Sequence, residues 1–134
     1  MRLKQVVLFN IVIIICILVG CKKPPYYPPY KNVKGFVIGK ETCTGNSDTE
    51  YWLVDLTFRA NTPQYGDTLL LNGVTYTNVV KTKGLRDLKE EGKRVSIDFD
   101  TITPSKIETT GCTVSNPTTY KLKEIFVINL FEIL

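Results

Sequence analysis

The side chains that could carry out chemistry on this chain are carboxylates, because the sequence contains no histidine. Ser-His-Asp and Cys-His arrangements are therefore excluded, and the commonest metal ligand is missing. Asp98 and Asp100 lie two residues apart on one face of a predicted strand, a spacing that suits paired acid/base carboxylates. Arg94 and Ser96 share that face, so we interpret it as a solvated charged surface and predict no catalytic residue there.

A second group of oxygen ligands lies in residues 45–50, Gly-Asn-Ser-Asp-Thr-Glu. Calcium binds such oxygens, but this stretch lacks the spaced aspartates and the distal bidentate glutamate of a known calcium loop. We interpret it as a polar loop between two strands and predict neither a metal nor a cofactor. The sequence also has no Ser-x-x-Lys, no Cys-x-x-Cys and no glycine-rich phosphate loop.

Residues 18–21, Leu-Val-Gly-Cys, end an apolar run that follows Arg2 and Lys4. A basic start, an apolar middle and a small residue before the cut are typical of a secretory signal, and the run is shorter than a membrane span needs. The four residues resemble the lipobox of bacterial lipoproteins. The resemblance implies cleavage before Cys21, a diacylglycerol on its sulfur and acylation of its new amino group. We thus expect residues 1–20 to be a cleaved signal peptide; a short uncut transmembrane anchor is the alternative.

Residues 21–32 are expected to be a lipidated cysteine and a Pro/Tyr-rich tether. The two Pro-Pro pairs in residues 24–30 favour polyproline II, which makes a stiff spacer of roughly 20 Å. A proline-rich ligand for the groove of a partner protein is the alternative. In some bacteria, an acidic residue directly after the lipidated cysteine favours retention in the inner membrane. Lys22 occupies that position here, which favours the outer membrane. We therefore expect an extracytoplasmic protein of the cell envelope, held by membrane lipid through acylated Cys21.

The charge of the chain argues against a nucleic-acid partner. The whole sequence carries a formal charge of +4, from 17 basic and 13 acidic residues. Five of the basic residues precede Asn32, so 12 basic residues face all 13 acidic ones in the remainder, a formal −1. A nucleic-acid-binding domain carries its positive charge on the folded part. We expect Lys22 and Lys23 to contact anionic lipid head groups instead.

Two of the four cysteines are left for the folded part, because Cys16 is removed with the signal peptide and Cys21 is expected to carry lipid. In an oxidising compartment, Cys43 and Cys112 then form an even pair. We predict a disulfide that joins the end of the first strand to the loop before the last one. It is expected to stabilise the domain by about 4 kcal/mol. A redox pair is the alternative, but neither close spacing nor a neighbouring base supports it.

The rest of the chain alternates apolar and polar residues as β-strands do. Asn72-Gly73 between two β-rich runs indicates a hairpin, because a type I′ turn needs positive φ at both central residues. Leu85 and Leu88, followed by Gly92, predict one or two turns of helix. We expect the last run, which is apolar on both faces, to be a central strand or to turn one face to a packed loop. The expected strands are residues 34–40, 51–58, 68–71, 74–80, 94–100 and 125–134.

This order of strands, with a helix before the fifth, resembles the oligonucleotide/oligosaccharide-binding (OB) fold, a small Greek-key barrel. The resemblance covers most of residues 33–134 and rests on the order of the elements, not on a motif. It implies an all-β domain with one short helix, a disulfide-linked Greek-key β-barrel; a small β-sandwich is the alternative. Barrels of this kind bind sugars or extended polymers on one face. A possible ligand face is therefore assigned to Tyr51, Tyr65, Tyr76 and Tyr120, while Trp52 and Phe58 are expected to be buried.

We predict a membrane-anchored, non-enzymatic binding or structural module of the cell envelope. Its partner is expected to be an envelope protein or a glycan. One alternative is an inhibitor or accessory subunit of an envelope enzyme, which presents a rigid side chain from residues 101–119. The other is a hydrolase that uses carboxylates alone, which would need two of them in one cleft.

Overall fold

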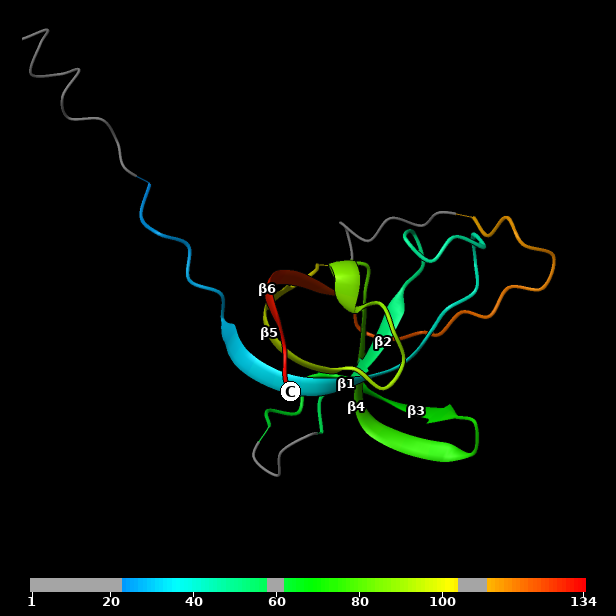
Figure 1. The fold of residues 1–134 in the computed structure, drawn as a ribbon, viewed down its shortest axis with the longest axis horizontal. Helices are drawn as coiled ribbons and strands as arrows, with labels where there is room; N and C mark the ends of the chain where they lie inside the picture. Colours follow the sequence, from blue (N-terminus) through cyan, green and yellow to red (C-terminus); the bar gives the residue numbers. More distant parts are fainter. Residues whose placement is uncertain (1–22, 58–61, 104–110) are drawn as a thin grey trace, which may run out of the picture.

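The computed structural model describes residues 23–57, 62–103 and 111–134 (Figure 1). They form an all-β domain with a single turn of 3₁₀ helix, as the sequence predicts. Cys21 and Phe58 lie outside the described residues. The elements are β1 (Tyr30–Lys40), β2 (Trp52–Asp55), β3 (Asp67–Leu71), β4 (Val74–Thr82), η1 (Arg86–Leu88), β5 (Arg94–Thr101) and β6 (Ile125–Glu132).

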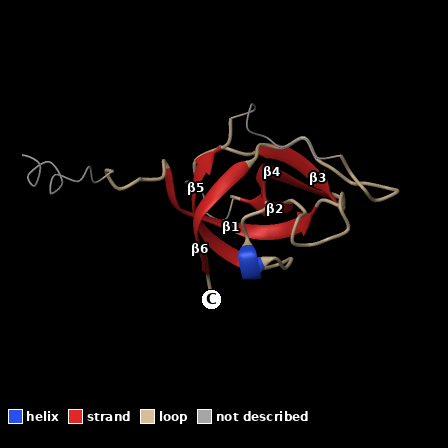
Figure 2. Ribbon diagram, turned by 90° about the horizontal axis from the view of Figure 1, so that it is seen from above, coloured by secondary structure: helices blue, strands red, loops and turns tan. Residues whose placement is uncertain are grey.

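All six strands belong to one sheet with the order β3-β4-β2-β1-β5-β6 and antiparallel neighbours. The alternative of a β-sandwich, which needs two sheets, is therefore wrong for the described residues. The sheet is strongly curved (Figure 2). A parallel bridge between Lys81 in β4 and Glu124, just before β6, connects distant parts of it, with a 3.0 Å hydrogen bond from the Lys81 N–H to the Lys123 carbonyl.

The main hydrophobic core lies on the concave face of this sheet. Val95, Ile97 and Phe99 of β5 are fully buried there, as the alternation of that strand predicts. Trp52 is buried as expected, 5% exposed. Leu85, just before η1, is also fully buried in this core, so the short helix covers apolar side chains rather than extending into solvent.

A second, smaller core lies on the opposite face of the sheet, beneath the β3–β4 hairpin. Asn72 and Gly73 have φ values of 51° and 80°, which confirms the predicted positive-φ turn between the two strands. The hairpin packs onto β1 and β2 and onto the segment that leads to β6. The members of this outer cluster are Ile38, Leu53, Leu69 and Val79, with Phe36, Leu71, Tyr76, Tyr120 and Leu122 partly buried against them.

Two strands differ from the sequence-based expectation. β1 begins at Tyr30, three residues before the predicted domain boundary, because the Tyr30 ring stacks on Phe99 with centroids 4.6 Å apart. β6 is an edge strand rather than a central one. Its inward residue Ile125 is buried, but Phe126 and Phe131 on its other face are 62% and 58% exposed. The apolar character of both faces is thus not explained by packing within the described residues.

Gly66→Ala is expected to destabilise the domain by about 1–3 kcal/mol, because a methyl group there overpacks a rigid site. A Cβ on Gly66 would lie 2.5 Å from the carbonyl oxygen of Val79, which is backbone and cannot rotate away. Asn78, which is 1% exposed, fixes the position by accepting the Gly66 N–H at 2.6 Å. Thermal unfolding followed by circular dichroism measures the effect. Gly111→Ala, where a Cβ would meet no atom of the described residues within 4 Å, is the control and should leave the melting temperature unchanged.

Candidate interaction site

Two loops meet at one end of the sheet and are joined covalently. The predicted disulfide between Cys43 and Cys112 is present, with Cα atoms 4.5 Å apart and a sequence separation of 69. It connects residues 41–50, which follow β1, to residues 111–120, which precede β6. We call these two segments the linked loops. In Figure 1 they lie together, in cyan and orange, at the far side of the domain from the N-terminal segment.

Backbone hydrogen bonds hold the linked loops together beside the disulfide. Thr42 and Thr118 form an antiparallel bridge in which each N–H donates to the other carbonyl at 2.8 Å. The Cys43 carbonyl accepts the N–H groups of Thr113 at 2.8 Å and Val114 at 3.2 Å. The geometry of the loops is therefore set by several independent contacts, which is what a preorganised binding surface requires.

The Glu50 carboxylate fixes the first of the linked loops from within. It accepts the backbone N–H groups of Cys43 at 2.8 Å, Thr44 at 2.7 Å and Gly45 at 2.8 Å, and only 2% of the residue is exposed. Burial raises the pKa of Glu50, but the hydrogen bonds from these three N–H groups outweigh it, so the pKa lies below its ordinary value. In residues 45–50, the stretch compared with a calcium loop, the glutamate side chain therefore binds backbone N–H groups of its own loop.

An ion pair between a buried carboxylate and a partly buried ammonium group fixes the second loop. Lys81 Nζ lies 3.0 Å from Glu41 Oε1 and donates to the Tyr120 carbonyl at 3.0 Å, while the Tyr120 N–H donates to Glu41 Oε1 at 2.8 Å. One carboxylate and one ammonium group therefore join the end of β1, the end of β4 and the segment before β6. Sequence reasoning missed Glu41 and Lys81 because their contact spans 40 residues.

The four tyrosines assigned to a possible ligand face are all partly exposed, but they lie in three different environments. Tyr76 and Tyr120 belong to the outer cluster. The Tyr65 ring packs 5.6 Å from Phe99, at the margin of the main core. Tyr51 has Lys81 Nζ 4.7 Å and Lys83 Nζ 4.6 Å from its ring centre and donates its hydroxyl to Glu124. The structure therefore does not bring the four rings together on one platform.

Asp98 and Asp100 lie on the outer face of β5, where both are used to hold the N-terminal segment. The Tyr26 hydroxyl donates to the Asp100 carboxylate, and the Asn32 N–H donates to Asp98 at 2.7 Å. The Asn129 side-chain amide, followed by the Asn32 N–H, lowers the pKa of Asp98. Both carboxylates thus have hydrogen-bond partners within the domain.

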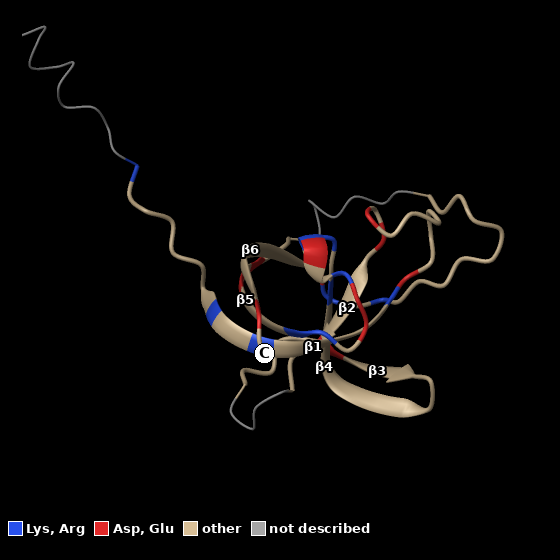
Figure 3. Ribbon diagram, viewed as in Figure 1, with Lys and Arg blue, Asp and Glu red and all other residues tan. Residues whose placement is uncertain are grey.

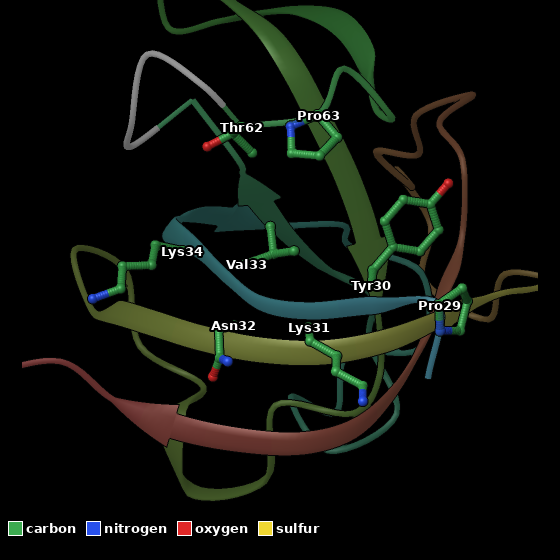
Figure 4. A pocket seen from close by; sticks show the side chains of 8 residues that line it. All are labelled: Pro29, Tyr30, Lys31, Asn32, Val33, Lys34, Thr62 and Pro63. Atoms are coloured by element: carbon green, nitrogen blue, oxygen red, sulfur yellow. The ribbon is translucent and has the colours of Figure 1, made fainter. Parts of the chain in front are cut away.

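Two of the depressions in the surface of the described residues border the residues discussed above. One, of about 440 Å³, lies between the start of β1 and Pro63, and no carboxylate is among its lining residues (Figure 4). The other, of about 370 Å³, has Asp67 and Glu124 in its wall beside Tyr65 and Lys123. Asp67 accepts the Lys123 N–H at 2.7 Å, whereas the Oε2 atom of Glu124 is buried and has no hydrogen-bond partner. Among the described residues, Glu124 is the one carboxylate with a buried oxygen that lacks a hydrogen-bond partner.

Charges of both signs are interspersed around η1 and the linked loops (Figure 3). Among the described residues, no three His, Cys, Asp or Glu side chains gather as a metal site would require. Within those same ranges there is also no helix with the length and apolar character of a membrane span. No family model, curated protein or solved structure matches this chain.

Proposed function

We propose that this chain is a lipid-anchored protein of the cell envelope that presents the linked loops and the tip of the β3–β4 hairpin to a partner protein. One observation carries the proposal. The N-terminal segment leaves the domain on one side, and the hairpin lies on the opposite side in both Figure 1 and Figure 2. A domain held by lipid at its N-terminus therefore directs this far end away from the membrane.

The far end has the composition of a protein-binding surface. The linked loops are held by the disulfide and by backbone hydrogen bonds and carry exposed threonine, serine and asparagine side chains, so we expect them to lose little conformational entropy on binding. The hairpin tip beside them exposes Leu70 by 67% and Val74 by 51%. Tyr120 packs in the same outer cluster as Leu69 and Leu71, so the second linked loop and the hairpin share one hydrophobic cluster. Apolar residues with a polar rim are typical of protein interfaces.

A glycan is the less favoured partner. Sugar rings that stack on a protein need exposed aromatic side chains grouped on one face. The outer face of β2 and β4 is instead filled by the outer cluster, and the tyrosines assigned to a ligand face are dispersed. The alternative of an inhibitor or accessory subunit would use the same surface and differs only in that the partner protein is an enzyme.

The proposal includes an OB-like arrangement of the strands. If the projecting strand β3 is set aside, η1 lies between the third and fourth of the remaining five strands, and the bridge from Lys81 to Glu124 brings β4 to β6. In OB-folds, the loops between the first two and the last two strands border the ligand site. Here these are the segments that contain the linked loops, which supports their choice as the binding surface.

The anchor is tested by substitution of the acceptor thiol. Wild-type chain and the control Cys16→Ser, whose change lies in the expected leader, should both incorporate radioactive palmitate and sediment with membranes. Cys21→Ser should do neither, because its side chain cannot form the thioether. An unlabelled wild-type chain, or unchanged fractionation of Cys21→Ser, would contradict the anchor.

The partner is tested in cells with a photo-cross-linking amino acid at Leu70 on the hairpin or at Asn116 in the linked loops. Both positions should give the same discrete protein adduct, and Glu91, at the exposed turn after η1, is the control that should give none. No adduct from either position, or adducts from all three alike, would overturn the choice of a protein partner at this end.

One observation favours the hydrolase alternative enough to test it. Glu124, whose buried Oε2 atom has no hydrogen-bond partner, lines the same depression as Asp67, so two carboxylate residues border one hollow. If they catalyse glycan cleavage, wild-type chain releases reducing ends from envelope polysaccharide and Glu124→Gln does not. Equal release by both chains, or none by wild type, rules this alternative out.

A further inference from the structure

We propose that the outer face of β5 and β6 rests on the membrane surface, with the Phe126 and Phe131 rings in the head-group region. The inference deepens the proposed function and rests on it, because it needs lipid on Cys21. It also gives a reason for the apolar outer face of β6, which nothing in the described residues covers.

Both phenylalanines lie on the same face. Phe126 pairs with Asp100 and Phe131 with Ser96, and these two β5 residues alternate with the fully buried Val95, Ile97 and Phe99. The rings therefore project from the convex side, 62% and 58% exposed. Exposed large apolar side chains grouped on one face indicate an interaction surface.

The position of the N-terminal segment identifies the membrane as the occupant of this face. Tyr26 donates its hydroxyl to Asp100, the cross-strand partner of Phe126. Cys21 precedes Tyr26 by five residues, which span at most about 18 Å when fully extended. A lipid chain on Cys21 therefore enters the bilayer close to the strand pair that carries Phe126. No such limit brings a second copy of the chain to this face.

The chemistry of the segment fits a lipid surface. Tyr26 and Tyr27 are 62% and 69% exposed, and aromatic rings of this kind favour the head-group level. Lys31 Nζ lies 4.7 Å from the Tyr27 ring centre, and Lys23 is exposed, so two cations accompany the rings where anionic lipids would lie. Asp98, an acidic residue of the same face, already accepts hydrogen bonds from Asn32 and Asn129.

The test uses the full lipidated chain, reconstituted into phosphatidylethanolamine/phosphatidylglycerol vesicles with or without bromine on the acyl chains. Phe126→Trp and Phe131→Trp each add one fluorophore to Trp52, which is buried and supplies a constant background. Each added tryptophan should lose roughly half of its emission in brominated vesicles, since a ring at the boundary of head groups and acyl chains lies near the quencher. Leu70→Trp, similarly exposed at the opposite end, is the matched control and should lose almost none.

The outcomes separate this inference from the proposed function. If the chain carries palmitate and sediments with vesicles but both new tryptophans behave like Leu70→Trp, the membrane contact is overturned and the anchor stands. The membrane contact is also overturned if the emission of both shifts to the blue without quenching as the chain dimerises. If the chain carries no lipid and stays in solution, the anchor and the contact are overturned together.

Discussion

Replacing Cys43 and Cys112 together with serine is expected to lower the free energy of unfolding by about 4 kcal/mol, because the disulfide closes a loop across a sequence separation of 69 in the unfolded chain. Small domains have a total stability of about 5–15 kcal/mol, so the loss should shift the denaturation midpoint strongly. Denaturant titration followed by the fluorescence of Trp52, the only tryptophan, measures it.

Two comparisons separate the cross-link from the substitutions. Wild-type chain in reductant should unfold at nearly the midpoint of the double variant, and reductant should leave the double variant unchanged. Hydrogen exchange at the Thr42–Thr118 bridge should accelerate more than exchange at Val95 in the core, because the bridge lies beside the broken link. A loss below about 1 kcal/mol would show that the other contacts of the linked loops already supply the constraint.

The fold is largely predictable because its signals are local. The period-two alternation of residues 94–100 places Val95, Ile97 and Phe99 in the core, and the structure buries all three. Asn72-Gly73 indicates the hairpin because that turn needs positive φ at two adjacent residues, and both have it. The pairing of Cys43 with Cys112 follows from the hypothesis that Cys16 is removed and Cys21 carries lipid, because two of the four cysteines then remain.

The position of β6 is not predictable, because a strand that is apolar on both faces has the pattern of a central strand. Burial by the rest of the chain and burial by an external surface leave the same pattern in sequence. Only the sheet order, with β6 at an edge, distinguishes them. The residues that break the expectation, Phe126 and Phe131, are those on which the proposed membrane contact depends.

The contacts that build the candidate interaction site could not be predicted for a different reason. Glu41 and Lys81 look like ordinary charged residues until the sheet brings them to 3.0 Å, and Tyr26 meets Asp100 across 74 residues. The Pro/Tyr segment, predicted as a stiff spacer, is therefore attached to β5 through Tyr26, five residues after Cys21, rather than standing free of the domain. Long-range pairs of this kind leave no local pattern, because their spacing is set by the whole topology.

Glu50→Ala is expected to lower the free energy of unfolding by about 3 kcal/mol, because it leaves backbone N–H groups of the first linked loop without their charged acceptor. The carboxylate holds Cys43, Thr44 and Gly45 in place, so the loss should also loosen the loop next to the disulfide. Denaturant titration measures the change. Glu91→Ala removes an exposed carboxylate of the same charge and is the matched control, with an expected change within about 0.5 kcal/mol.

The same carboxylate gives the stability of the domain a pH dependence of known sign. Its pKa in the folded chain lies below the ordinary value of 4.5, so the unfolded chain binds the proton more readily. The contribution of Glu50 is therefore complete above that ordinary value and is lost as the pH falls through the folded pKa. Denaturant titrations of wild type and Glu50→Gln should differ most at neutral pH and converge in acid. A difference that stays constant with pH would show that the carboxylate is protonated equally in both states, and the three N–H groups would then be held by the fold rather than by the charge.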